Sequence, residues 1–168
     1  MNKVQIRAAT LDDAPKMLDF VKAVAMETDF LILDEADALP SVDEERAFIL
    51  STKRNPKDCL FLAICNNEVV GMANFKGNPR VRISHHGEIG ISVRKKYWGK
   101  EVATRLMAEL IHFAESIGVT IIHLLVRSDN ERAIAFYKKI GFEQDGKFKN
   151  YIKIGDEYFD SDHMSLHL

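Results

Sequence analysis

Tyr97-Trp98-Gly99-Lys100-Glu101-Val102-Ala103-Thr104 joins an apolar strand candidate, Glu88 to Val93, to an amphipathic helix candidate from about Gly99 to Ile117. Apolar residues recur through this helix at helical spacing, so one face should be buried. The helix begins without a Ser, Thr, Asp or Asn cap, although its first backbone N–H groups need an acceptor. This stretch therefore sets the local fold and needs an acceptor from outside the helix.

Positive charge surrounds this bare helix start, contributed by Arg94, Lys95, Lys96 and Lys100. Cations at a helix N-terminus oppose the macrodipole unless an anion lies between them. Glycine, free N–H groups and positive charge are together typical of a phosphate site. The alternative is a solvated basic turn capped by water. Other predicted helix starts have capping side chains, at Thr10, Ser41 and Ser128.

The composition is that of an ordinary globular protein. The 168 residues are 46% hydrophobic and 29% charged, which suits one domain spanning residues 1–168. A formal net charge of -2 argues against a general nucleic-acid binder. No apolar run approaches the length of a membrane span, and Met1-Asn2-Lys3-Val4 leads into a strand-like segment, not a signal peptide. Cys59 and Cys65 should be reduced, so we expect a cytoplasmic protein with no membrane partner.

The histidines do not indicate a metal site. His85 and His86 are adjacent, so on a strand their side chains would point to opposite faces. His163 and His167 alternate with apolar residues, as on the open face of a strand. We therefore expect no metal.

The predicted elements run strand, helix, helix, three strands, helix, strand, helix and two strands. Asn66-Asn67 and Gly155-Asp156 suit tight hairpin turns. The run from Thr120 to Arg127 is almost continuously apolar, which predicts a strand buried on both faces. The fold class is mixed α/β, with helices on the faces of one sheet.

A second motif follows, in the predicted helix from Asp129 to Ile140. Its pattern of Asn130, Ala133, Tyr137, Gly141 and Phe142 resembles the closing motif of the GCN5-related N-acetyltransferase (GNAT) family. The stretch Val93 to Thr104 resembles the acyl-CoA pyrophosphate loop of that family. The resemblance covers essentially the whole chain. It implies a mostly antiparallel central sheet with about four helices on its two faces, and acetyl transfer from acetyl-CoA to an amine by direct attack in a ternary complex.

The resemblance also assigns roles to residues. Tyr137 would protonate the departing CoA thiolate, and Asn130 would hydrogen-bond the CoA arm. The backbones of Ile91 and Val93 would pair with the pantetheine amides as an added strand does. The pyrophosphate would be held by Gly99, Lys100, Glu101, Val102, Ala103 and Thr104. Read from local chemistry alone, Tyr137 has the alternative of a core tyrosine, and Asn130 that of a capping residue.

Two positions depart from the family pattern. Trp98 stands where the family has Arg or Gln, and Glu101 stands where it has glycine close to the phosphate. A carboxylate there would repel phosphate unless its side chain points to solvent. As a first-turn acid, however, Glu101 suits the helix macrodipole.

Attack on a thioester needs a neutral amine, whereas an alkylamine with a pKa near ~10.4 is mostly protonated at neutral pH. A carboxylate, acting directly or through water, can remove that proton. Glu88 is the candidate, because Gly90 lies two residues along on the same face and would leave space beside it. The alternative is a strand-end carboxylate paired with a surface cation.

The acceptor is less well defined by the sequence. Acidic residues concentrate after the first helix, at Asp34, Glu35, Asp37, Asp43, Glu44 and Glu45. They favour a small-molecule amine acceptor of cationic character, because negative charge concentrates cations. The alternatives are an ordinary solvated loop, a protein or peptide N-acetyltransferase, and a catalytically weak acyl-CoA-binding regulatory module. The family resemblance also allows a homodimer.

Overall fold

One mixed sheet forms the centre of the fold in this computed structural model, which describes residues 3–34 and 36–168. Within those residues, seven strands lie in the order β1-β2-β3-β4-β5-β7-β6, and only β4 and β5 pair in parallel. The expected mostly antiparallel α/β sheet is confirmed. The strands are β1 (Gln5–Ala8), β2 (Asp58–Cys65), β3 (Glu68–Gly77), β4 (His86–Val93), β5 (Ile121–Arg127), β6 (Glu143–Ile154) and β7 (Glu157–His167).

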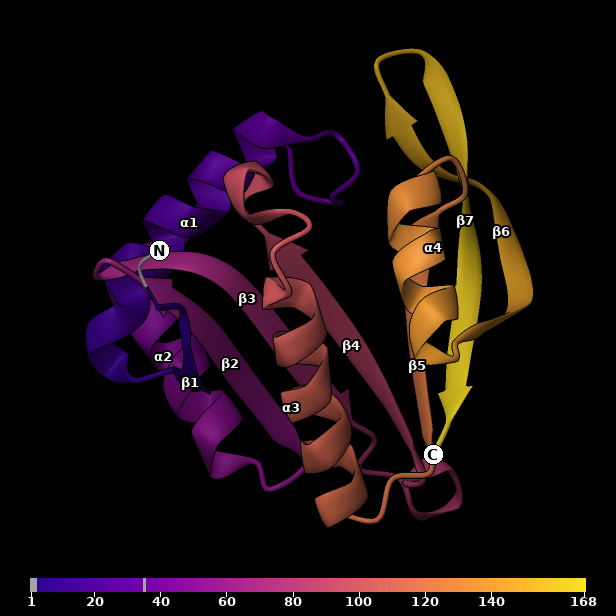
Figure 1. Ribbon diagram of the computed structural model, residues 1–168, viewed down its shortest axis with the longest axis horizontal. Coiled ribbons are helices and arrows are strands. Elements are labelled where there is room, and N and C mark those ends of the chain that lie inside the picture. The colour runs from indigo at the N-terminus through magenta and orange to yellow at the C-terminus, as the bar shows by residue number, and fades with distance from the viewer. Residues whose placement is uncertain (1–2, 35) are drawn as a thin grey trace.

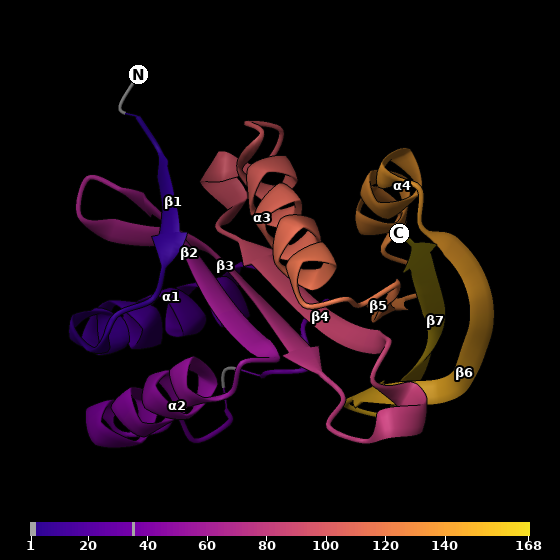
Figure 2. The ribbon, with the colours of Figure 1, turned by 90° about the horizontal axis from the view of Figure 1, so that it is seen from below.

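Two helices lie on each face of the sheet (Figures 1 and 2). The helices α1 (Ala14–Glu27) and α2 (Val42–Arg54) cover β1 to β3 on one face, and α3 (Val102–Ser116) and α4 (Glu131–Ile140) lie on the other. Each layer has its own buried core. The core under α1 and α2 includes Met17, Phe20, Ile49, Leu60 and Leu62, and the core under α3 and α4 includes Phe75, Leu106, Leu110, Ile122 and Met164.

The parallel strands β4 and β5 pair only near their starts. Their register ends at Glu88 opposite His123, and the ribbons separate beyond that point (Figure 1). The other edge of β4 stays paired with β3 as far as Val93 opposite Gly71. The last residues of β4 therefore have one backbone edge that no strand of the described sheet occupies, and it faces α4.

The prediction that β5 is buried on both faces is wrong. Ile122, Leu124 and Val126 are buried, whereas Ile121 and His123 on the opposite face are only half-buried. The cause is that α1 and α2 cover β1 to β3 and leave the β5 side of that face open (Figure 2). An almost continuous apolar run therefore did not require two covered faces.

The predicted starts of two helices also need correction. Ser41 caps α2 with Glu44 as expected, but the cap of α4 is Asn130, while the Ser128 hydroxyl donates to Asp162 at 2.6 Å. The helix expected from Gly99 starts at Val102. Asn66 and Asn67 both have positive φ, at 51° and 65°, which confirms the predicted turn between β2 and β3.

Among the described residues, no helix has the length and apolar character needed to cross a bilayer.

Candidate active site

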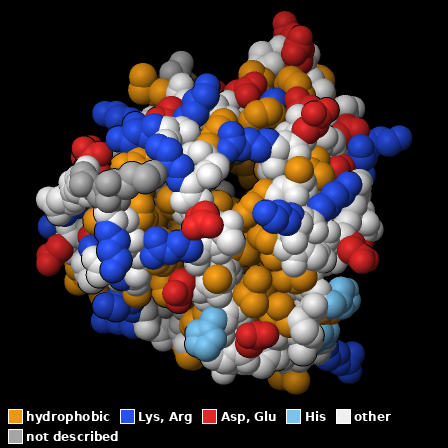
Figure 3. Space-filling model, in the orientation of Figure 1, with side chains coloured by type: hydrophobic (Ala, Val, Ile, Leu, Met, Phe, Trp, Pro, Cys, Tyr) orange, Lys and Arg blue, Asp and Glu red, His pale blue; other side chains and the backbone are white. Residues whose placement is uncertain are grey.

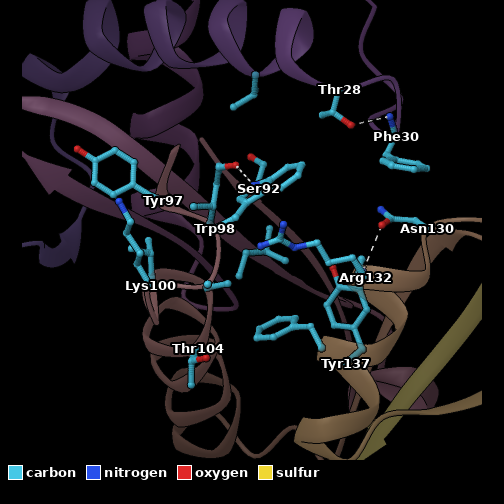
Figure 4. Close-up of a pocket in the computed structure, with 18 of the residues that line it drawn as sticks. Thr28, Phe30, Ser92, Tyr97, Trp98, Lys100, Thr104, Asn130, Arg132 and Tyr137 are labelled. Carbon is cyan, nitrogen blue, oxygen red and sulfur yellow. Dashed lines mark hydrogen bonds between the residues drawn. The ribbon is translucent and has the colours of Figure 1, made fainter. Parts of the chain in front are cut away.

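A cavity of about 420 Å³ lies between the end of β4, the loop before α3, the first turns of α4 and the segment after α1. Lys and Arg side chains gather around a hollow on this face, with hydrophobic side chains beside it (Figure 3). The cavity brings together all the residues predicted to bind CoA: Ile91, Val93, Gly99, Lys100, Glu101, Val102, Ala103, Thr104, Asn130 and Tyr137. Figure 4 shows Lys100, Thr104, Asn130 and Tyr137 around it.

The loop before α3 has the geometry of an anion site. No side chain caps α3, and its first intrahelical hydrogen bond runs from the Arg105 N–H to the Glu101 carbonyl at 2.9 Å. The N–H groups of Val102, Ala103 and Thr104 therefore have no intrahelical acceptor. A Cβ built on Gly99 would have no atom within 4 Å, so the backbone there is open to a ligand.

Glu101 lies at the N-cap of α3, one position before the first turn in which the sequence placed it. Its backbone is left-handed, with φ of 61° and ψ of 0°, and its side chain is exposed. Glycine adopts this conformation without the steric cost that a Cβ brings. This is a physical reason why the family pattern has glycine at the position of Glu101.

The four cations near the loop serve different partners. Arg94 pairs with Glu27 through Nε at 2.8 Å, and the same carboxylate accepts the Lys95 backbone N–H at 2.7 Å. Lys96 lies 3.7 Å from Glu68. Of the four, only Lys100 lines the cavity. The interpretation of all four as phosphate-facing charges is therefore wrong. Two cavity cations that the sequence analysis missed come from the opposite wall: Arg132 and Lys139.

Tyr137 extends from α4 into the cavity (Figure 4). Burial raises the pKa of its phenol to about 12, so the hydroxyl keeps its proton at neutral pH. Its ring packs against Phe136 and Phe142, with centroids 5.4 Å and 5.6 Å away. Among the described residues, no protein group hydrogen-bonds the hydroxyl. The ring is thus fixed in the core while the hydroxyl is left for a ligand.

Asn130 combines the two roles considered for it. Its side-chain oxygen accepts the Ala133 N–H at 3.2 Å, which caps α4. The amide nitrogen has no protein acceptor among the described residues, and the residue lines the cavity. One side chain can therefore start the helix and still donate to a ligand.

Glu88 does not line the cavity, unlike the other predicted site residues. Its side chain is exposed, and the space expected beside Gly90 is filled, because a Cβ there would lie 2.7 Å from the Asn74 side-chain oxygen. Glu88 is opposite His123, whose pKa is lowered by burial although the Glu88 charge acts to raise it. Its role as a base remains a prediction.

A row of histidines crosses three strands beside Glu88. The His123 ring lies 6.2 Å from His86 and 5.3 Å from His163, and His163 hydrogen-bonds Asp145. The residues lie far apart in the sequence, so sequence spacing gave no sign of this row. Among the described residues, no group of three or more His, Cys, Asp or Glu side chains has the arrangement of a metal site.

One wall of the cavity is formed by Thr28, Phe30 and Leu31, which follow α1; it is called the acceptor wall because the acceptor was expected beside this segment. No described acid of the 34–45 segment lines it. Asp34 and Asp37 accept backbone N–H groups of their own loop, at 2.8 Å each, and Glu35 lies outside the described residues. Asp34 and Asp37 are therefore used within their own loop, as in the solvated-loop alternative.

A buried arginine holds this acceptor wall in place. The Arg127 guanidinium lies 4.3 Å from the ring centres of both Phe30 and Phe159. It donates to Asp129 at 2.6 Å and 3.0 Å and to the Asp29 carbonyl at 3.0 Å. Because Phe30 lines the cavity, Arg127 connects the acceptor wall to the end of β5. In the sequence, Arg127 ends an almost continuously apolar strand, and nothing there indicated this role.

Comparisons with known proteins agree with this geometry. The sequence profile described as Acetyltransferase (GNAT) family matches residues 25–142. An L-amino acid N-acetyltransferase of Escherichia coli is 36% identical over 105 residues, which is 62% of this chain and 65% of that protein. A spermidine N(1)-acetyltransferase of the same species is 26% identical over 110 residues, 63% of this chain and 56% of that protein. The chain thus matches less than two thirds of either relative.

The fold has a near match among solved structures. An acetyltransferase of the GNAT family from Streptococcus pneumoniae superimposes with a TM-score of 0.93 at 27% identity. The match covers 99% of this chain and 100% of that one.

Proposed function

The chain belongs to the GNAT acetyltransferase family, and we propose that it transfers the acetyl group of acetyl-CoA to the primary amine of a small molecule. Transfer would occur by direct attack in a ternary complex. The observation that carries this proposal is that one cavity contains both the uncapped start of α3 and the side chain of Tyr137. Acyl transfer from a phosphate-bearing thioester can use both groups. The anion site would bind a phosphate, and the proton donor would stabilise the leaving thiolate.

The residues fit acetyl-CoA, which would supply the activated acetyl thioester. The free N–H groups of Val102, Ala103 and Thr104 would hold its pyrophosphate at the positive end of α3. The open edge of β4 at Ile91 and at the Val93 N–H would pair with the amides of its arm, while the Val93 carbonyl already accepts the Trp98 indole N–H. Apart from the chain neighbours of Gly99, no atom of the described residues lies within 4 Å of the place where a Cβ of Gly99 would stand.

Tyr137 would act on the departing sulfur through its hydroxyl. A phenol with a pKa of about 12 is a weaker acid than a thiol with a pKa of ~8.5, so complete proton transfer is uphill in the free protein. We therefore expect Tyr137 Oη to stabilise the developing charge by donating a hydrogen bond. Proton transfer would be completed only if the bound ligands lower that pKa.

Glu88 is proposed as the base that accepts the amine proton. Because it lies outside the cavity, we assign it a path through intervening water and no direct contact with the amine. Its exposure lets the carboxylate return the proton to solvent.

For the acceptor we propose a small cationic amine, such as a polyamine, with an amino acid as the next class to test. Similarity to the spermidine and L-amino acid acetyltransferases supports these classes. The exposed acids Asp34 and Asp37 would act as a long-range attraction near the acceptor wall, with no contact to the amine. A protein or peptide acceptor is the remaining alternative within the enzyme class.

Release of the CoA thiol across an amine panel tests the proposal. We expect turnover with a polyamine or an amino acid that exceeds turnover with N-terminal peptides. Turnover with peptides alone would reject the small-amine acceptor.

One observation favours a second function, a regulatory acyl-CoA binder: the Glu101 carboxylate beside the phosphate loop. Tight CoA binding without turnover on any amine would select that function.

A further inference from the structure

Trp98 and Arg132 meet across the cavity from opposite walls. The Arg132 guanidinium lies 4.1 Å from the centre of the Trp98 ring, and both residues line the cavity. Figure 4 shows Arg132 reaching from α4 toward Trp98. The Trp98 indole N–H donates to the Val93 carbonyl at 2.8 Å, which fixes the ring at the end of β4. A cation on α4 is thus held beside the loop that precedes α3.

Of the four cations near the loop, only Lys100 lines the cavity. The Arg94 charge is paired with Glu27 and that of Lys96 with Glu68. Lys100 faces the cavity, but the neighbouring Glu101 has the opposite charge. A phosphate bound at the start of α3 therefore needs positive charge from another element.

Arg132 is placed to supply that charge. Among the described residues, no carboxylate lies within ion-pair distance of it, and its side chain is exposed toward the cavity. A guanidinium can stack one face on an aromatic ring while its planar N–H edge binds a phosphate through two hydrogen bonds. Stacking on the Trp98 ring would hold the planar guanidinium in the orientation that such binding requires.

We infer that Arg132, stacked on Trp98, is a phosphate-binding residue for acetyl-CoA. This inference rests on the proposed function and adds a phosphate-binding residue at a position between Asn130 and Ala133 that the second motif leaves unspecified. Trp98 then serves as the platform for a cation that arrives from α4, at the position where the family loop has a polar residue. The ligand is a phosphate group, either the pyrophosphate or the 3′-phosphate of the coenzyme.

The test compares Arg132→Gln with Lys138→Gln, an equal loss of charge on the same helix at an exposed residue outside the cavity. Binding of acetyl-CoA is followed by calorimetry and by the fluorescence of Trp98, the single tryptophan of the chain. We expect Arg132→Gln to weaken binding about tenfold or more, as for a lost hydrogen bond to a charged group. Lys138→Gln should change it less than about twofold, as for a surface charge.

Three further comparisons sharpen the test. Acetyl thioester of pantetheine, which has no diphosphate, should react equally well with the wild type and Arg132→Gln. Binding of acetyl-dephospho-CoA, which lacks the 3′-phosphate, identifies the phosphate. If Arg132→Gln still binds it more weakly than the wild type does, Arg132 binds the pyrophosphate. If the two proteins bind it equally well, Arg132 binds the 3′-phosphate. Trp98→Leu should weaken acetyl-CoA binding more than Trp98→Phe, because both lose the indole N–H but only Phe keeps a ring under Arg132.

Equal acetyl-CoA affinity of Arg132→Gln and Lys138→Gln would overturn the inference and leave the proposed function standing. Failure of the wild-type protein to bind acetyl-CoA at all would instead reject the proposed function, and this inference with it.

Discussion

Gly99 and Glu101 stand two residues apart in the loop before α3 and share the left-handed backbone, with φ of 72° and 61°. Only one of the two is a residue that takes this conformation without strain. The loop therefore has a left-handed backbone at Glu101, although a residue with a Cβ disfavours that conformation. A non-glycine residue in this region costs about 1–2 kcal/mol.

Replacing Glu101 by glycine should raise the free energy of unfolding by up to about 1 kcal/mol, since the relief of strain exceeds the added chain entropy. It should also tighten acetyl-CoA binding, because a negative charge leaves the phosphate loop. Thermal unfolding and calorimetry measure the two effects. Glu101→Gln is the control: it should tighten binding but leave stability close to that of the wild type. A less stable Glu101→Gly protein would contradict the strain argument.

Arg127→Met should lower the free energy of unfolding by about 2 kcal/mol, because two cation–π contacts and the partner of Asp129 are lost. Urea denaturation provides the measurement. The matched control is Arg46→Met, which removes an exposed pair with Asp43 and should cost less than about 0.5 kcal/mol. Equal costs for the two variants would show that the stacked guanidinium contributes nothing beyond a surface pair.

Tyr137→Phe should lower kcat by about a hundredfold and leave the affinity for acetyl-CoA nearly unchanged, because it removes only the proton donor. Initial rates and equilibrium binding separate the two. An unchanged kcat would mean that the hydroxyl takes no part in the reaction.

The pH dependence follows from the same residue. A group with its pKa raised to about 12 stays protonated below that pH, so Tyr137 should give no falling limb in kcat between about pH 7 and 10. The rising limb should come from deprotonation of the amine and its base. A falling limb in that range that disappears in Tyr137→Phe would show that the pKa is much lower when the ligands are bound.

The local chemistry of the chain was enough to predict the uncapped start of α3, whereas the roles of the phosphate loop and of Tyr137 stay predictions, and that of Tyr137 came from the family resemblance. A helix without a cap and a following N-x-x-A-x-x-x-Y pattern are both contained in short stretches, so no long-range information was needed. The order of helices and strands along the chain and the hairpin at Asn66-Asn67 followed from periodicity and turn chemistry.

What sequence could not supply is the set of partners that the fold brings together. Glu27 meets Arg94 from 67 positions away, which removes a charge that the sequence appeared to offer to phosphate. Arg132 reaches Trp98 only because α4 lies opposite the loop. The space expected beside Gly90 is filled by the side chain of Asn74, which comes from the neighbouring strand β3. Each of these is a contact between different elements, which spacing within one element cannot indicate.

The most direct test of the central claim follows the acetyl group itself. Acetyl-CoA labelled with ¹³C in the acetyl carbonyl is mixed with the best amine of the panel, and the product is observed by NMR. The account predicts an N-acetylated amine, with intersecting initial-rate lines when both substrates are varied, as direct attack in a ternary complex requires. Binding of acetyl-CoA with no labelled amide from any amine, or parallel lines from a covalent acetyl-enzyme, would contradict it.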